Sequence, residues 1–384
     1  MLQLALCAAT LPPPERLILP SRTRWFATLA ILAMTVLALG SAEVIARFAF
    51  PGFADDSHYQ ELLLARLLNS GLVVESPGDP SRFLAYSPNA VRTFSGPEYR
   101  YTVRTNSLGF RSKEIQPAVP GEYRVLLLGD SMFVGIGSEE EQTIAVRLEE
   151  RSRAAGGPGG KNLSAFNFAV GGFNTAQELS VLRHFGAEIR PSLVVLGFFV
   201  GNDFLPNALA RFDEQGNYAV DDGKLKDLRE GVRTGHAGLY LPSAVWRILA
   251  LNLLVPRLRY RMASTPEVMH RSLELLGEVN NDCRALGVPL LIVMIYPREG
   301  VEGGWVASWS GSREVAQELI RLGRGEGLQI LDLLSVMRGA TDARDCYYKS
   351  DGHLTPAGNA RVADAIYRVI SQGAGPGESR RASP

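Results

Sequence analysis

The chain has 384 residues, which is enough for one large domain with appendages or for two small domains. It carries 40 Lys and Arg against 40 Asp and Glu, so it lacks the basic excess that nonspecific phosphate binding needs, and we expect no nucleic-acid partner. With 46% hydrophobic residues it is too apolar to be mainly disordered, which leaves a globular protein of enzyme size.

The first predicted element is an apolar helix that approaches the length of a membrane span. Residues 25–42 run without a charge, and we predict a single-pass anchor over 25–45. Arginines precede this stretch and mostly acidic residues follow it, which predicts a cytoplasmic segment over 1–24 and an exported, periplasmic chain beyond residue 50. The alternative is secretion after cleavage of a signal peptide, for which 39–44 offers a weak small-residue site.

A stalk is predicted over 46–85, where prolines and acidic residues surround a short apolar run at 61–68. One α/β domain is predicted over 86–372, followed by a disordered tail over 373–384. Cys7, Cys283 and Cys346 form no CxxC pair, so the sequence predicts neither a metal site nor a dense disulfide scaffold. A single disulfide between Cys283 and Cys346 and two unpaired thiols are both open.

Five short apolar runs in the α/β domain are typical of strands that helices cover on both faces. They lie at 124–128, 165–170, 193–199, 289–295 and 328–333. Helical patterns alternate with them at 141–154, 175–185, 266–285, 312–323 and 356–371. The alternation predicts a parallel sheet between two helix layers. In sheets of this kind the functional residues gather just beyond the carboxyl ends of the strands.

Residues 204–264 interrupt this alternation with a polar stretch and then an amphipathic run at 245–262. Its apolar part is too short to span a membrane. We favour a cap over a substrate cleft, with a membrane-surface contact or a plain packing helix as alternatives. The GGPGG run at 156–160 does not fit a phosphate loop, and the sequence holds no GxGxxG, so we predict no cofactor.

A serine and a histidine occupy two of the strand-end loops. Ser131 follows Gly129 and Asp130 after the first predicted strand; alone, this tripeptide is better explained by a helix-capping serine than by a nucleophile. His353 stands beside Asp351 in the loop that opens the last predicted helix. A serine attacks an acyl carbon only when a base takes its proton and a carboxylate orients that base. His353 can supply the base and Asp351 the carboxylate.

Acyl transfer also needs donors for the developing oxyanion. Gly172, after the second predicted strand, can present a backbone N–H, and Asn202, after the third, can present its side-chain amide. Each has a simpler interpretation as a turn residue. Their succession after consecutive strands, followed by Asp351 and His353, favours an acyl-transfer site.

In this order the motifs resemble those of the SGNH subgroup of the GDSL hydrolases, in a membrane-anchored bacterial form. The resemblance covers about 86–372, including the segment 101–111, and implies a flavodoxin-like α/β/α sandwich. It implies that Ser131 is the nucleophile and first oxyanion donor and that Gly172 and Asn202 are further donors. It also implies that His353 is the base, that Asp351 orients it, and that Gly129, Asp130 and Asp203 support the motifs.

Two positions depart from the family pattern. Val200 stands where the third motif has its first glycine, and Asp351-Gly352-His353 is one residue shorter than the family's DxxH. The shorter spacing is similar to that of some polysaccharide-acetylating relatives. Asp345 is the less favoured substitute for Asp351.

The resemblance implies a serine esterase that acts on acetyl or other short acyl esters, carried on a surface glycan or a lipid, without metal or cofactor. A polysaccharide O-acyltransferase using the same residues is the first alternative. A non-catalytic glycan-binding relative is the second. The sequence leaves the acyl chain length and the oligomeric state open.

Overall fold

The computed structural model describes residues 21–53, 55–68, 85–214, 216–339 and 343–373. The described residues up to Tyr59, together with Pro242–Ile248, form one compact unit, and those of Gln60–Leu241 and Leu249–Pro384 form another. The predictions for the segment before residue 21, for Cys7, for residues 54 and 69–84 of the stalk and for the tail after Gly373 lie outside the described residues.

The first unit is built on one long apolar helix, α1 (Ser21–Ala49). Within its stretch Trp25–Ala49 an 18-residue window has a mean hydropathy of 2.1, and only 6% of that window is buried, so the helix is long and apolar enough to cross a membrane. The predicted apolar helix is therefore present, and it extends four residues beyond the predicted end at 45. A membrane anchor and a signal sequence both fit such a helix.

A part of the predicted insertion belongs to this first unit. The carboxylate of Glu43 accepts hydrogen bonds from the Ser243 hydroxyl at 2.8 Å and from the backbone N–H groups of Ala244 and Val245 at 2.9 and 3.1 Å. These N–H groups open α8 (Ala244–Leu249), so Glu43 supplies the acceptor that the start of a helix needs. No local sequence pattern predicts this pairing, because the partners are about 200 residues apart.

The second unit is centred on a five-stranded parallel sheet. Its strands are β3 (Glu122–Leu128), β4 (Asn162–Asn167), β5 (Leu193–Phe199), β8 (Leu290–Ile295) and β9 (Ile330–Asp332). All five predicted strands are present. The prediction for β4 was three residues too late, because Phe168, Ala169 and Val170 are apolar and buried although they follow Asn167, the last residue of the strand.

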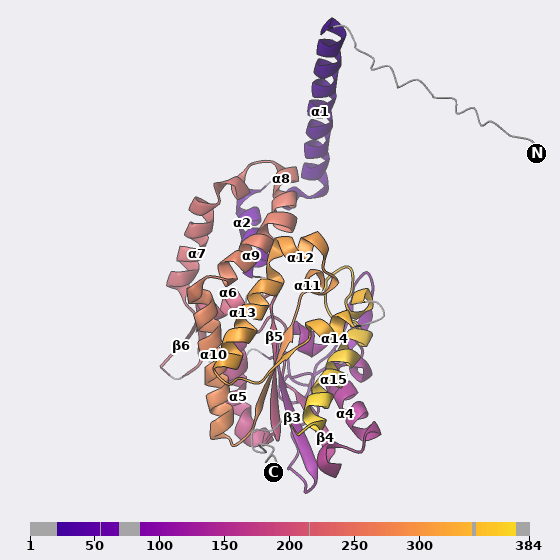
Figure 1. Cartoon of the computed structure of the whole chain (residues 1–384), viewed down its shortest axis with the longest axis vertical. Helices are drawn as coiled ribbons and strands as arrows, with labels where there is room; N and C mark the ends of the chain where they lie inside the picture. The colour runs from indigo at the N-terminus through magenta and orange to yellow at the C-terminus, as the bar shows by residue number, and fades with distance from the viewer. Residues whose placement is uncertain (1–20, 54, 69–84, 215, 340–342, 374–384) are drawn as a thin grey trace, which may run out of the picture. The chain divides into compact units, whose positions relative to one another are not determined.

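Two helix layers cover the sheet, with α4 and α15 packed together on one face and α5, α10 and α13 on the other (Figure 1). Their bounds are α4 Ile144–Ala154, α5 Thr175–Ile189, α10 Pro266–Ala285, α13 Ser312–Gly325 and α15 Pro356–Ser371. The helix predicted from 141 begins at Ile144, because Thr143 caps it and Glu140–Gln142 forms a separate 3₁₀ turn. Every residue of β5 and β8 is buried, as covering on both faces requires.

The strand order is β4-β3-β5-β8-β9, which confirms the flavodoxin-like sandwich. In chain order the sheet runs 2-1-3-4-5, so the connections leave β3 in opposite directions. At such a switch point the loops beyond neighbouring strands diverge and leave a crevice at the carboxyl edge. The loops after β3 and β5 therefore flank the crevice.

Shorter elements surround this core. Before the sheet come α2 (Asp56–Leu68) and an antiparallel hairpin of β1 (Val91–Ser95) and β2 (Arg100–Arg104), and α3 (Ser131–Val134) follows β3. The insertion contains α6 (Phe204–Leu209), β6 (Ala210–Phe212), β7 (Tyr218–Val220), α7 (Asp222–Gly235), α8, a π-helical turn (Ala250–Leu254) and α9 (Val255–Ala263). After β8 come α11 (Arg298–Glu302) and α12 (Gly304–Ser310), and after β9 come α14 (Leu334–Arg338) and a 3₁₀ turn (Ala343–Cys346).

Candidate active site

Ser131 is the first residue of α3, in a tight turn at the carboxyl end of β3. Asp130, not Ser131, caps this helix, because its carboxylate accepts the Met132 N–H at 2.9 Å. The capping interpretation of the serine is therefore wrong, and its hydroxyl is available for other contacts. The turn also favours Gly129, since a Cβ there would stand 3.0 Å from the Phe133 side chain.

His353 lies against Ser131 although 222 residues separate them in the chain. The His353 Nε2 atom is 3.0 Å from the Ser131 Oγ atom, a hydrogen-bond distance. The other ring nitrogen, Nδ1, is 3.3 Å from Asp351 Oδ2, within ion-pair distance but without the alignment of a hydrogen bond. Asp351, rather than the alternative Asp345, is thus the carboxylate that contacts His353.

Asp351 is held in its charged form. Its Oδ1 atom accepts the backbone N–H of His353 at 3.1 Å, and its Oδ2 atom accepts the hydroxyl of Tyr99. Burial acts to raise the pKa of Asp351, but the contacts with His353 and Tyr99 outweigh it and lower the pKa to about 2. A permanently charged carboxylate is what an imidazole that becomes protonated needs beside it.

Asn202 lies beyond β5 and faces the same crevice. Its side-chain Nδ2 atom donates to Asp130 Oδ2 at 2.8 Å, which links the loop after β5 to the turn that carries Ser131. An amide nitrogen has two hydrogens, so one is left for another acceptor.

Gly172 stands in the turn after β4 with a φ of +82°, a conformation that residues with a side chain rarely adopt. Its neighbour Gly171 is close to Ser131, since a Cβ there would stand 3.9 Å from the Ser131 Cβ atom. The turn that contains the predicted donor thus runs beside Ser131.

A layer of buried carboxyl groups lies among these loops. Asp130, Asp203 and Glu178 of α5 are at most 1% exposed, and Asp203 accepts the Phe199 N–H at 2.7 Å. Burial raises the pKa of Glu178 and of Asp203 well above the usual range, and the nearby negative charges add to this. Sequence reasoning missed Glu178, because only the structure shows that the first eight residues of α5 are all buried.

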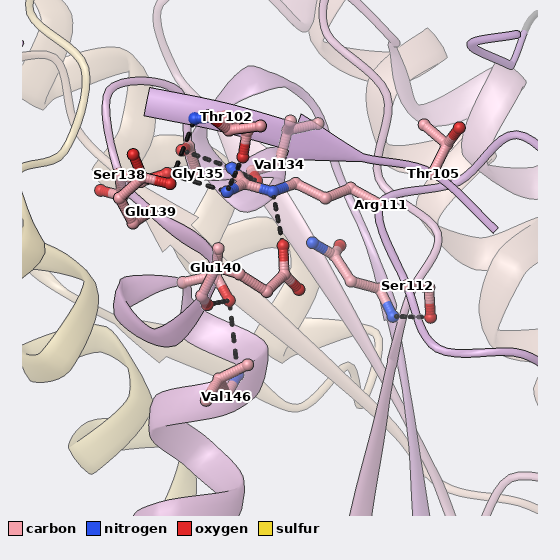
Figure 2. Close-up of polar contacts among 12 residues, drawn as sticks. Thr102, Thr105, Arg111, Ser112, Val134, Gly135, Ser138, Glu139, Glu140 and Val146 are labelled. Atoms are coloured by element: carbon pink, nitrogen blue, oxygen red, sulfur yellow. Dashed lines mark hydrogen bonds and ion pairs between the residues drawn. The ribbon is translucent and has the colours of Figure 1, made fainter. Parts of the chain in front are cut away.

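A buried arginine holds the segment that follows Ser131, as Figure 2 shows. Arg111 is 1% exposed, and its Nε atom donates to Glu140 Oε2 at 2.9 Å. Its Nη atoms donate to the carbonyl oxygens of Val134, Gly135, Ser138 and Thr102 at 2.8 to 3.3 Å. Only a guanidinium offers five donors in a fixed plane, so this residue fixes the exit of α3 against β2. The predicted segment 101–111 contains Arg111, but no sequence pattern pointed to this role.

A pocket of about 410 Å³ opens beside Ser131, Asn202 and His353. The insertion supplies part of its wall through Leu251, Leu253 and Pro256. Two tryptophans of α12, Trp305 and Trp309, line it as well, and Trp305 is 70% exposed. The pocket therefore combines polar groups around the serine with apolar and aromatic walls.

Among the described residues, no group of three or more His, Cys, Asp or Glu side chains is arranged to hold a metal ion. Cys283 and Cys346 are both buried and are not joined in a disulfide, so of the two possibilities for this pair the disulfide is absent.

Comparison with known proteins gives one family match. Residues 259–382 match the SGNH hydrolase-like domain of the acetyltransferase AlgX. This stretch includes Asp351 and His353. It overlaps the C-terminal part of 86–372, the region whose motifs resemble those of the SGNH hydrolases. No curated protein matches the chain.

Several solved structures are similar to this chain. One is the lipase/acylhydrolase from Enterococcus faecalis, with 14% identity over 67% of this chain and 100% of that chain and a TM-score of 0.38. Another is the lipase Lip_vut3 from a goat rumen metagenome, with 12% identity, 65% and 97% coverage and a TM-score of 0.41. A third is the acetyl xylan esterase AlAXEase, with 12% identity, 64% and 99% coverage and a TM-score of 0.38.

Proposed function

We propose that this chain, which belongs to the SGNH hydrolases, cleaves short acyl esters through a covalent acyl-serine at Ser131. The observation that supports the proposal most is the 3.0 Å contact between Ser131 Oγ and His353 Nε2, with Asp351 at the opposite ring nitrogen. A serine, a histidine and a charged carboxylate in this sequence of contacts form the arrangement that activates a hydroxyl nucleophile.

The reaction has two steps. Ser131 Oγ attacks the ester carbonyl carbon while its proton passes to His353 Nε2, and the resulting tetrahedral oxyanion collapses with loss of the alcohol, which takes that proton. Water then attacks the acyl-serine and gives a proton to His353, and collapse returns the proton to Ser131 as the carboxylic acid leaves. Asp351 stabilises the imidazolium in both steps.

The oxyanion is stabilised by the backbone N–H groups of Ser131 and Gly172 and by the second amide hydrogen of Asn202. The hydrogen bond from Asn202 to Asp130 supports this role, because it fixes the amide without using its second hydrogen. Donors that are fixed before the charge develops cost no reorganisation at the moment of reaction. Asp203 and Gly129 maintain the backbone of the two loops concerned.

The test compares the full-length protein in detergent with Ser131→Ala and His353→Ala in the hydrolysis of p-nitrophenyl acetate, butyrate and octanoate. Both variants should lose the activity, and the chain-length profile should favour acetate. Ser371→Ala and His270→Ala, on exposed helix surfaces, are the matched controls and should retain it. Activity that persists in Ser131→Ala would reject the proposal.

A second candidate function is transfer of the acyl group to a glycan hydroxyl instead of water. Two observations favour it: the matched family is described as an acetyltransferase domain, and the pocket has room and aromatic walls beyond what an acetyl group needs. The test supplies an activated acetyl donor with neutral and uronic-acid oligosaccharides and measures ester-bound against free acetate by mass spectrometry. A non-catalytic glycan-binding role would instead require that wild-type protein neither hydrolyses nor transfers.

We also propose that α1 remains on the protein as a membrane anchor, with the site outside the cytoplasm. The arginines before the apolar stretch and the acidic residues after it support this orientation. Alkaline phosphatase fused after residue 384 should be active in cells, and the fusion should stay in the membrane after alkaline washing. A soluble exported fusion would favour signal cleavage.

A further inference from the structure

We propose that Tyr99 is a positioning residue that orients Asp351 for the reaction, and that the β1–β2 hairpin braces the two loops that form the site. This inference rests on the proposed function. Tyr99 lies in the turn between β1 and β2, and its hydroxyl donates to Asp351 Oδ2. The same oxygen lies 3.3 Å from His353 Nδ1.

The short spacing between Asp351 and His353 explains why an outside contact is needed. Only Gly352 separates the two residues, and it adopts a φ of +76° to let the chain turn between them. Even so, Asp351 Oδ2 and His353 Nδ1 are not aligned as a hydrogen bond. Within the loop, the hydrogen bond from the His353 backbone N–H holds Oδ1 of the carboxylate, and the Tyr99 hydroxyl holds Oδ2, the oxygen that faces the imidazole, from another element.

Tyr99 is itself well held. Its ring centroid is 4.8 Å from that of Tyr348 and 5.6 Å from that of Tyr101, and the Tyr348 hydroxyl donates to the Gly137 carbonyl at 2.7 Å. A Cβ at Gly137 would stand 2.4 Å from the Tyr348 ring, so this packing depends on a glycine in the segment after Ser131. Burial and the contact with Asp351 raise the pKa of Tyr99, so its hydroxyl stays a donor.

The hairpin contacts both sides of the site. On the side of Asp351, the Glu98 carboxylate accepts the Ser350 N–H at 2.5 Å. On the side of Ser131, Arg111 donates to the Thr102 carbonyl at 3.3 Å, and the Thr102 N–H donates to Glu139 at 3.2 Å (Figure 2). One hairpin thus links the segment after Ser131 to the loop of His353, although the two segments lie at opposite ends of the domain sequence.

The decisive experiment is a double-mutant cycle on p-nitrophenyl acetate hydrolysis with Tyr99→Phe, Asp351→Asn and the double variant. Tyr99→Phe keeps the ring and removes only the hydroxyl, and we expect kcat to fall about tenfold or more with little change in KM, the size expected for a hydrogen bond to a charged group. In the Asp351→Asn background, Tyr99→Phe should have almost no further effect, because residues that act as a unit are not additive.

Tyr123→Phe is the matched control, since it removes a tyrosine hydroxyl near the start of β3, outside the hairpin and away from the loops at the carboxyl ends of the strands. We expect its kcat to stay within about twofold of wild type, as for residues outside the reacting unit. A normal kcat for Tyr99→Phe, or an equal loss in both backgrounds, would overturn the positioning role while Ser131→Ala is still inactive. Wild-type protein that neither hydrolyses the ester nor reacts at Ser131 with a fluorophosphonate would overturn the proposed function, and this inference with it.

Discussion

Asn202 is the residue at which the loops after β3 and β5 meet. Its amide bonds Asp130, whose carboxylate also caps the helix of Ser131. We predict that Asn202→Ala lowers kcat for p-nitrophenyl acetate about 10²- to 10³-fold with little change in KM, because in the proposed mechanism it removes a donor that acts mainly on the oxyanion. Steady-state kinetics on the full-length protein measure this.

Asn281→Ala, on the exposed face of α10, is the control and should leave kcat unchanged. The melting temperature of each variant shows that the fold is retained. An Asn202→Ala variant that keeps full kcat would remove the side-chain amide from the proposed oxyanion site, leaving only the backbone donors.

Residues that belong to a motif were predictable from the sequence, and residues that act across elements were not. Ser131, Asp351 and His353 stand in strand-end loops and meet as expected. Tyr99 and Arg111 act through contacts with segments more than 20 residues away, and their neighbours in sequence give no sign of this. Only the packing of the hairpin against the site loops reveals them.

At the scale of elements, β5 positions α3 through one close contact. A Cβ at Gly197 of β5 would stand 2.5 Å from the ring of Phe133, which is fully buried in α3. We predict that Gly197→Ala destabilises the protein by about 1–3 kcal/mol, the usual cost of overpacking a core. Because Phe133 lies two residues after Ser131, kcat should fall as well.

Gly277→Ala is the matched glycine control in α10, where no atom lies within 4 Å of the added Cβ. It should stabilise the helix by about 0.5–1 kcal/mol and leave kcat unchanged. Thermal melting and ester hydrolysis measure both variants. Equal melting temperatures and activities for the two would contradict the role given to the contact between β5 and α3.

Element boundaries were predicted well where a local signal ends the element. The starts of α10 and α15 match because Thr265-Pro266 and Thr355-Pro356 combine a cap position with a proline in the first turn. The start of β4 was misplaced, because its first residues are polar and partly exposed at the sheet edge while the loop beyond it is apolar. A run of apolar residues indicates that a segment is buried, but it indicates only indirectly that the segment pairs with other strands.

At the scale of the whole molecule, the alternation of strands and helices predicted the layers but not which segments meet. The order of strands and the pairing of the insertion with the end of α1 depend on contacts between distant residues such as Glu43 and Ser243. A single sequence does not encode these in any local pattern. At the candidate active site the order of the motifs supplied this missing information, because the resemblance to the SGNH hydrolases implied that the loops carrying the motifs converge.

The buried carboxyl layer predicts how the stability of the whole protein depends on pH. Neither carboxyl oxygen of Glu178 has a hydrogen-bond partner among the described residues, and burial raises its pKa and that of Asp203 well above their values in an unfolded chain. Between the unfolded and the folded pKa, the folded state binds more protons than the unfolded state. The contribution of these two groups to stability is therefore greatest at low pH and is lost as pH rises through their folded pKa values, by at most about 1.4 kcal/mol per pH unit for each proton.

Glu178→Gln tests this, because glutamine has nearly the same shape and stays uncharged at every pH. We predict that the variant loses stability less steeply than wild type between pH 5 and pH 8, so that its advantage over wild type grows as pH rises. Denaturant unfolding of the full-length protein in detergent at several pH values measures the difference. Glu188→Gln, exposed on the same helix, is the control and should follow the wild-type profile. Parallel profiles for Glu178→Gln and wild type would show that Glu178 does not lose its proton in this range, and would assign the pH dependence to Asp203 or to other groups.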